Sequence, residues 1–139
     1  MINFYNQSLE FKFPDKNKTR QWLRQVVEIE TKREKNIGNI AFIFCSDDEI
    51  LEVNSKYLNH NYLTDVITFN YNDGNKISGD VFIGLNTVKE NSEIYSVTFE
   101  EELRRVIVHS VLHLLNYDDA TEDQQKIMRG REDYYLSIF

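Results

Sequence analysis

The stretch VIVHSVLHLL, from Val106 to Leu115, decides how this chain is expected to fold. Only His109, Ser110 and His113 in it are not apolar, so a helix formed here would be covered by protein on most sides. Residues four apart lie one turn above each other, which places the two imidazoles on the same face. The stretch therefore predicts a buried helix that carries two polar groups in need of partners.

The flanking residues indicate where this helix begins and ends. TFEE, which starts at Thr98, has the residues of a capping box, a common start of a helix. Asn116 follows the apolar run, and Asn tolerates the left-handed conformation that commonly follows a last helical turn. A reversal there would bring the run YDD, Tyr117–Asp119, back alongside the helix end. A carboxylate would then join the two imidazoles.

Two neutral histidines and one carboxylate form a three-ligand set with an open coordination position. That open position distinguishes a catalytic zinc site from a closed structural one, and water bound there would be the nucleophile. The other interpretation is that the histidines are core residues bonded to backbone carbonyls and that the aspartates begin a solvated loop. Spacing alone leaves both interpretations open.

The first third of the chain predicts one helix and at least one buried strand. Two aromatic-rich runs near the start, INFYNQ and LEFKF, are predicted to be strands or extended segments. A helix is expected after Pro14, with its charged end EIETKREKN in solvent. IAFIFC, residues 40–45, is a short apolar run typical of a strand buried on both sides. The inward residues of the helix are expected to be Trp22, Leu23, Val26 and Val27.

The middle of the chain predicts a capped helix followed by a hairpin. SDDE, which starts at Ser46, is a capping box and predicts a helix to about Tyr57. DVITFNY and SGDVFIG flank the turn NDGN and predict two antiparallel strands, with a turn longer than two residues. A helix is also expected from Asn86 to about Ile94. The inward residues of the capped helix are expected to be Ile50, Val53 and Tyr57.

The C-terminal segment predicts a final helix. TEDQ, which starts at Thr121, is a further capping box, and Ile127, Met128 and Leu136 are expected to face inward. Alternating helices and apolar strands, plus one hairpin, predict a single α+β domain over residues 1–139. We expect a small mixed β-sheet packed with about five helices, with a zincin-like metal site on the penultimate helix.

Composition narrows the possible function classes. The formal net charge of -7 disfavours a general nucleic-acid coat, although it allows a local basic cleft. Cys45 is the single cysteine, so no intramolecular disulfide is possible and a cytoplasmic location is expected. No run of about 18 apolar residues occurs, and the start lacks a basic region before an apolar run. Neither a membrane span nor a signal peptide is therefore expected.

The opening motif resembles the YbeY family of bacterial metal-dependent endoribonucleases. HSVLHLLNYDD, His109–Asp119, is similar to the family signature HGxLHLxGYDH. TDVITF, residues 64–69, looks like the family's TDVLSF, and GDVFIG, residues 79–84, resembles its GDIxIx strand. Asn54 and Tyr57 also match the family segment ahead of the first of these strands. The resemblance covers nearly the whole chain.

The resemblance implies a hydrolase that cuts single-stranded RNA as an endonuclease. Its expected setting is ribosomal RNA processing, namely 16S rRNA maturation, with a role in ribosome assembly or quality control and with the small subunit or associated factors as partners. The implied metal ligands are His109, His113 and Asp119, and the cofactor is one divalent ion, with zinc expected.

This sequence departs from the family pattern at several positions. Asp119 stands where the family has its third histidine, and Ser110 and Asn116 replace two glycines. An anionic ligand should make bound water less acidic and favour harder ions somewhat more. Leu58 stands where the family has an arginine that is thought to bind phosphate.

Two residues are candidates to replace that arginine in substrate binding. They are His60, otherwise an exposed loop histidine, and Arg105, otherwise the partner of Glu101 or Glu102 on its own helix. Asp65 is the candidate catalytic residue, and its alternative role is to cap a turn before the strand.

Other features bear on the substrate. Ser110 follows His109 where a zinc protease would need the glutamate of HExxH, which counts against peptide hydrolysis. Tyr62 and Tyr71 could stack on bases. A general base would come from Asp65, Asp118 or outside the motif. Further basic candidates for RNA contact are Lys56, Arg104, Arg129 and Arg131.

Three functions are compatible with the sequence. The favoured one is a metal-dependent endoribonuclease in ribosomal RNA processing. The second is a metallohydrolase that uses the same site on another substrate. The third is a ribosome assembly factor without catalytic activity, in which the metal is structural.

Overall fold

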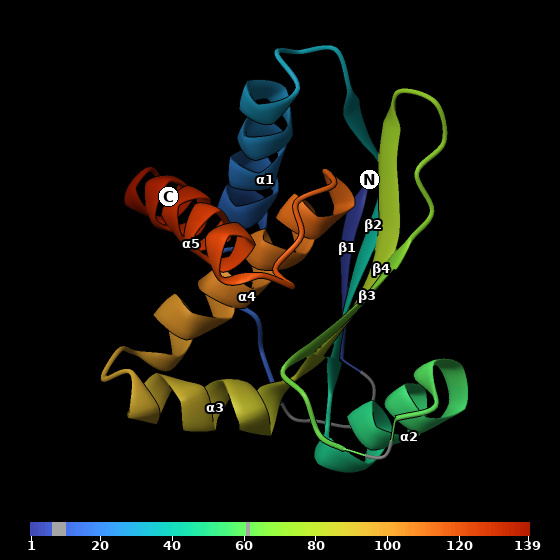
Figure 1. The fold of residues 1–139 in the computed structure, drawn as a ribbon, viewed down its shortest axis with the longest axis vertical. Helices are drawn as coiled ribbons and strands as arrows, with labels where there is room; N and C mark the ends of the chain where they lie inside the picture. The colour runs from blue at the N-terminus through green and yellow to red at the C-terminus, as the bar shows by residue number, and fades with distance from the viewer. Residues whose placement is uncertain (7–10, 61) are drawn as a thin grey trace.

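A computed structural model describes residues 1–6, 11–60 and 62–139 of the chain. Four strands and five helices lie within these residues (Figure 1). In chain order they are β1 (Ile2–Asn6), α1 (Lys16–Glu30), β2 (Asn36–Cys45), α2 (Asp47–Leu58), β3 (Val66–Asn70), β4 (Lys76–Gly84), α3 (Leu85–Ile94), α4 (Phe99–Leu114) and α5 (Glu122–Ser137).

The strands form one mixed sheet in the order β1-β2-β4-β3. β1 and β4 are parallel to β2, whereas β3 pairs antiparallel with β4 in the predicted hairpin. Gly74 in the turn has a φ of 58°, a conformation that glycine adopts without steric cost. The small mixed sheet with five helices confirms the predicted α+β single domain.

The sheet separates a large core from a small one. Phe42 and Phe44 of β2 belong to the large core, which the sheet shares with α1, α4 and α5, and Figure 1 shows these helices on the same side of the sheet. Ile43 and Cys45 point the other way and pack with Ile50 of α2. Since successive strand side chains point to opposite faces, this alternation explains why the run is apolar throughout.

The helix predicted from the opening stretch lies in the large core. Val108, Val111 and Leu112 are fully buried in it. Gly79 of β4 allows the end of α4 to approach the sheet, because a Cβ there would lie 2.9 Å from the Cδ2 of Leu114. The sheet thus fixes the position of the helix that carries both histidines.

The predicted helix starts are confirmed at Ser46, Thr98 and Thr121. Both halves of the capping box form at Ser46 and at Thr121. The Thr98 hydroxyl accepts a hydrogen bond of 3.1 Å from the Glu101 N–H. Among the described residues, no helix is long and apolar enough to cross a bilayer.

Several local predictions were wrong. Tyr57 and Ile127 are 59% and 57% exposed although both were expected to face inward. Ile127 lies one residue off the buried line of α5, which runs through Met128, Glu132 and Tyr135. Tyr57 lies in the last turn of α2, beyond the residues that pack in the small core, and its ring meets Phe69 edge-on.

Two further expectations concern the N-terminal third. Phe11–Phe13 of the run LEFKF form no strand, and Leu9 and Glu10 lie outside the described residues. Glu30 was expected at a solvated helix end, but its side chain is only 8% exposed. Tyrosine and arginine side chains from elsewhere in the chain cover its carboxylate.

Candidate metal centre

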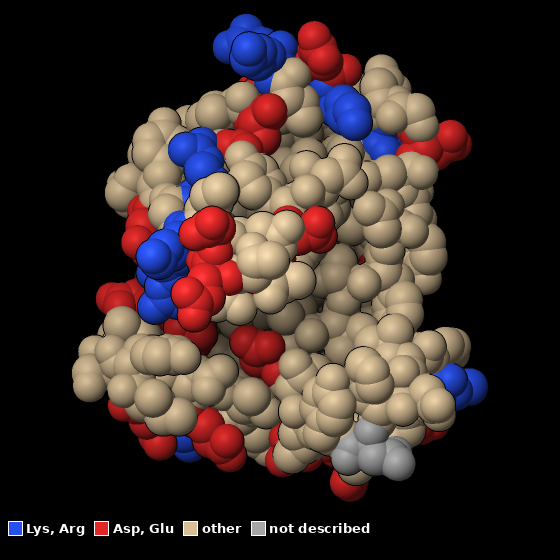
Figure 2. All heavy atoms as spheres, viewed as in Figure 1, with Lys and Arg blue, Asp and Glu red and all other residues tan. Residues whose placement is uncertain are grey.

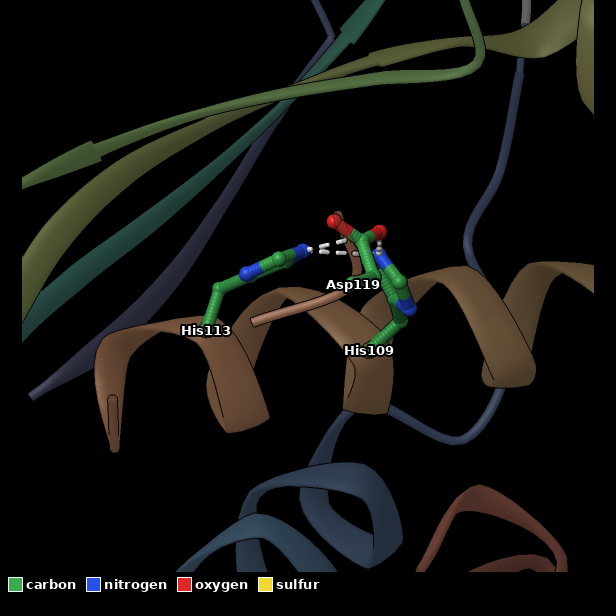
Figure 3. Close-up of side chains that lie close together, drawn as sticks. All are labelled: His109, His113 and Asp119. Atoms are coloured by element: carbon green, nitrogen blue, oxygen red, sulfur yellow. Dashed lines mark hydrogen bonds and ion pairs between the residues drawn. The ribbon is translucent and has the colours of Figure 1, made fainter. Parts of the chain in front are cut away.

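The two histidines of α4 share a face with Asp119, which returns to them from the following loop (Figure 3). α4 ends at Leu114, and Asn116 adopts the predicted left-handed conformation with a φ of 73°. The Tyr117 N–H then donates to the Leu112 carbonyl at 3.0 Å, which closes the reversal. The chain reversal expected at Asn116 is confirmed.

The geometry of these three side chains suits a metal ion. The Nε2 atoms of His109 and His113 lie 3.0 Å apart, and Asp119 Oδ2 lies 3.3 Å and 3.4 Å from them. Tetrahedral ligands at 2.0–2.1 Å from zinc would be separated by about 3.3 Å. Two imidazole nitrogens this close to each other and to a carboxylate oxygen present lone pairs to one point. The donor set therefore fits a single divalent ion.

Glu132 of α5 fixes the orientation of His109. Its Oε2 accepts a hydrogen bond of 2.6 Å from His109 Nδ1, and its side chain is 5% exposed. With the proton on Nδ1, the Nε2 lone pair points toward Asp119 and His113. Burial alone would lower the pKa of His109, but the hydrogen bond and charge of Glu132 raise it above its usual value.

The role of Glu132 was missed in the sequence. A signal was present, since Glu132 lies at helical spacing between Met128 and Tyr135, and a charged residue on an inward line needs a partner. The other carboxylate oxygen of Glu132 accepts from Arg105 Nη1 at 2.9 Å. Arg105 Nη2 also donates to Asp133 at 2.7 Å. The hydrogen bonds of Arg105 therefore go to α5 and not to Glu101 or Glu102.

A second buried carboxylate holds the loop that carries Asp119. Glu30, at the end of α1, accepts hydrogen bonds from the hydroxyls of Tyr117 and Tyr135 and one of 2.7 Å from Arg131 Nη2. Burial would raise the pKa of Glu30, but these hydrogen bonds and the Arg131 charge lower it below its ordinary value. Since Tyr117 precedes Asp119 by two residues, this cluster ties the loop to α1 and α5.

Two clefts meet at the histidine face. One, of about 620 Å³, lies toward α3 and α5, and Glu102, Arg105, His109 and Glu132 are among its lining residues. The other, of about 380 Å³, is lined by His109 and His113 together with residues of β3. Asp65 and Asp119 line both clefts.

Asp65 is placed at this junction by the sheet. The Gly84 N–H donates to the Asp65 carbonyl at 2.8 Å where β3 and β4 begin to pair. A Cβ at position 84 would lie 2.7 Å from the Thr64 carbonyl oxygen, so glycine permits this approach. Asp65, the candidate catalytic residue, thus shares the smaller cleft with all three candidate metal ligands and the larger one with His109 and Asp119.

The other predicted substrate residues lie farther from the metal centre. His60 is exposed, hydrogen-bonded to the Tyr62 hydroxyl at 3.0 Å, and lines neither cleft. Leu58, Tyr62 and Tyr71 are exposed, and Asp118 is exposed and also absent from both linings. Of the two candidates for the missing arginine, only Arg105 lies beside the ligands.

Comparison with known proteins agrees with the site geometry. A family model described as endoribonuclease YbeY matches residues 2–139. The chain belongs to this family. The family resemblance inferred from the three sequence motifs is thereby confirmed.

Curated relatives support the same assignment. The chain is 47% identical to an endoribonuclease YbeY of Bacteroides fragilis over 134 residues, which cover 95% of this chain and 94% of the relative. It is 42% identical to that of Flavobacterium johnsoniae over 139 residues, or 100% of this chain and 97% of the relative. These relatives therefore correspond to the whole chain.

A solved structure shows the same fold. The solution structure of TM1509 from Thermotoga maritima matches with a TM-score of 0.62 at 27% identity. The match covers 99% of this chain and 87% of that chain.

Proposed function

We propose that this protein is a cytoplasmic, metal-dependent endoribonuclease that hydrolyses phosphodiester bonds of single-stranded ribosomal RNA. The observation that carries the proposal is the convergence of His109, His113 and Asp119 on one point beside two clefts. Membership of the YbeY endoribonuclease family supports RNA as the substrate. The same membership favours an enzyme over an assembly factor in which the metal is only structural.

In this proposal His109, His113 and Asp119 hold one divalent ion, and zinc is the first candidate because the donor set is two imidazoles and a carboxylate. When bound, such an ion would supply Lewis-acid polarisation of the phosphodiester. Glu132 keeps the proton of His109 on Nδ1, so that Nε2 stays free as a donor of its lone pair.

Asp65 is the proposed general base. Asp65 lines both clefts at the candidate metal centre, so its carboxylate is in a position to accept the proton of an attacking water or hydroxyl. Arg105 reaches the larger cleft, but two carboxylates of α5 hold its guanidinium. We therefore assign Arg105 mainly to the support of Glu132, with phosphate binding limited to the part of the guanidinium that faces the cleft.

Cleavage of a labelled single-stranded RNA would test the proposed activity. We expect the zinc-loaded protein to cleave it, and both a chelated sample and His113→Ala to lose at least about 100-fold in rate, because a ligand is missing. Asp65→Asn should reduce the rate by about 100-fold or more at unchanged metal content. Activity that survives in His113→Ala would show that contamination or another site is responsible.

The ribosomal setting needs a separate experiment. We expect 16S rRNA precursors to accumulate in cells that lack the protein, and we expect His113→Ala not to restore their processing. Restoration by His113→Ala would instead favour the assembly factor with a structural metal. Cleavage of peptides or small phosphoesters without cleavage of RNA would favour a metallohydrolase of another substrate.

A further inference from the structure

Glu102 is a buried carboxylate that the proposed reaction does not use. It lies on α4, seven residues before His109, and is only 5% exposed. Among the described residues, none makes a hydrogen bond or a close ion pair with its side chain. Burial raises the pKa of Glu102, and the charges of Arg105 and Arg129 offset only part of this effect. Neither of its oxygens is among the fully buried side-chain atoms without a partner, so the carboxylate is open to the larger cleft, where a ligand can supply the hydrogen bonds that the protein does not.

The carboxylate of Glu102 belongs to the lining of the larger cleft, the same cleft that His109 and Asp119 line. Figure 2 shows this face of the molecule hollowed, with acidic atoms set back from the surface. Glu102 and His109 are separated by about 10 Å along the helix axis, at 1.5 Å per residue. One nucleotide can span that separation, so a base next to the cleaved bond could reach Glu102.

Other residues of the cleft complete a base-binding environment. Asn91 of α3 and Tyr95, which directly follows this helix, line it, and Tyr95 is exposed. Arg129 places its guanidinium 5.6 Å from the centre of the Tyr95 ring. An aromatic ring next to an arginine is a common platform on which single-stranded bases stack. Lys126 also lines the cleft, where it can meet a phosphate.

The partner that an unpaired carboxylate needs is a group with two adjacent donors. Guanine offers the N1–H and the N2 amine side by side on its Watson–Crick edge, next to the O6 acceptor. A carboxylate has two acceptor oxygens and can take both donors, while the amide of Asn91 can donate to O6. Adenine and cytosine present a donor beside an acceptor on that edge, and uracil presents a single donor between two acceptors.

We propose that the larger cleft is a guanine-binding subsite and that Glu102 is the residue that determines its specificity. This inference rests on the proposed function, because the guanine would belong to the RNA substrate. The subsite would bind the base of a nucleotide adjacent to the cleaved bond. Stacking on Tyr95 would hold the base, and Glu102 with Asn91 would read its edge.

Calorimetric titration of the zinc-loaded protein with nucleoside monophosphates tests the subsite without any cleavage. All the ligands carry the same phosphate, so contact with a metal ion contributes equally and the differences report the base. We expect GMP to bind at least about tenfold tighter than AMP, CMP or UMP, since a hydrogen bond to a charged group is worth more than tenfold in affinity. IMP, which lacks the N2 amine, should fall between them.

The matched variants are Glu102→Gln and Glu101→Gln, both on the first two turns of α4. Glu102→Gln keeps the shape of the side chain but removes one acceptor, so the preference for GMP should fall about tenfold. Glu101 is exposed and outside the cleft, so Glu101→Gln should keep the preference. Circular dichroism spectra and melting curves of both variants establish that they are folded.

Three results would overturn the proposal. They are equal affinity for all the nucleotides, a preference for GMP that survives Glu102→Gln, and binding of Mg²⁺ alone that depends on Glu102. Because binding is measured apart from catalysis, RNA cleavage without base preference would reject the subsite and leave the proposed function intact. Preference for GMP in a protein that cleaves no RNA would reject the nuclease function instead.

Discussion

Asp119 differs from the other two candidate ligands in charge and in exposure. Its side chain is 45% exposed, more than that of either histidine. The family signature has histidine at this position, so the candidate site of this chain would combine two neutral ligands with one anion. An anionic oxygen donor favours harder divalent ions more than an imidazole does. Aspartate in place of histidine at position 119 should therefore widen the range of divalent ions that the site binds, while the number of ligands stays at three.

Replacing Asp119 with alanine should release most of the bound metal. We expect at least about a tenfold loss of zinc affinity, because two ligands on one helix cannot complete the site. Elemental analysis of protein purified without added metal, with Asp118→Ala as the matched control, measures this. Asp119→His should retain zinc and bind manganese less well than the wild type. Unchanged metal content in Asp119→Ala would remove Asp119 from the ligand set.

Glu132 is proposed to affect metal binding indirectly, through its hydrogen bond to His109. Glu132→Gln should weaken zinc binding by about 10- to 100-fold, because a neutral amide holds the Nδ1 proton less strongly. Competition titration with a zinc-binding dye gives the affinity. Asp133→Asn, the neighbouring carboxylate that also binds Arg105, is the control and should stay within about threefold of wild type. Equal losses in both variants would point to Arg105, not to His109, as the group that matters.

The positions of single site residues could be predicted from the sequence where their contacts are with residues nearby in the chain. The spacing of the two histidines and the reversal at Asn116 follow from helix geometry, so a carboxylate of the run that follows could be expected beside them, and the family resemblance singled out Asp119. The partner of His109 lies 23 residues away on another helix. No local rule brings Glu132 to it, because that contact depends on how α5 crosses α4.

For the helices, too, features set by nearby residues could be predicted better than features set by distant ones. The capping boxes at Ser46 and Thr121 were correctly predicted because both partners lie within four residues, whereas at Thr98 only the hydrogen bond to the hydroxyl forms. Inward faces were predicted less well, since Ile127 and Tyr57 have helical spacing but are more than half exposed. The apolar face of a helix is buried only as far as a neighbour extends along it. Periodicity could therefore locate α2 and α5 but not the edges of their contacts.

Glu30 and its partners Tyr117, Arg131 and Tyr135 join α1, the loop after α4, and α5. This cluster should stabilise the fold measurably. Glu30→Gln removes the charge that accepts from Arg131 and both tyrosines, so the free energy of unfolding should fall by about 2 kcal/mol. Urea denaturation at neutral pH measures the change. Glu28→Gln, an exposed position on the same helix, is the control and should change little.

The same cluster predicts how stability depends on pH. The pKa of Glu30 is lowered below its ordinary value of 4.5 in the folded protein. Its contribution is therefore fully present above that value and is lost as the pH falls through the lower folded pKa. We expect the stability difference between wild type and Glu30→Gln to shrink below about pH 4.5. A difference that stays constant down to pH 3 or so would mean that Glu30 does not titrate in this range.

The whole molecule combines a strongly negative average charge with a proposed RNA substrate. With a formal net charge of -7, long-range attraction of RNA is weak, so binding must depend on a few local cations. Near the metal centre, Arg105 and Arg131 are already paired with carboxylates. Lys126 and Arg129 line the larger cleft and form no ion pair with any described residue. The fold and the family could be predicted from motifs, but this path for RNA could not, because it depends on which charges fold onto one another.

A molecule with so few free cations at its site should bind RNA with a weak dependence on salt. Each phosphate contact on a single strand contributes a slope of about -0.7 to log K against log salt, so two contacts give about -1.4. Fluorescence anisotropy of a labelled single-stranded RNA, with the His113→Ala variant to prevent cleavage, measures the slope. Lys126→Ala should make it shallower by about 0.7, whereas Lys56→Ala, on α2, should leave it unchanged. A slope steeper than about -3 would require a larger basic surface than the cleft provides, and RNA would then have to cross another face of the protein.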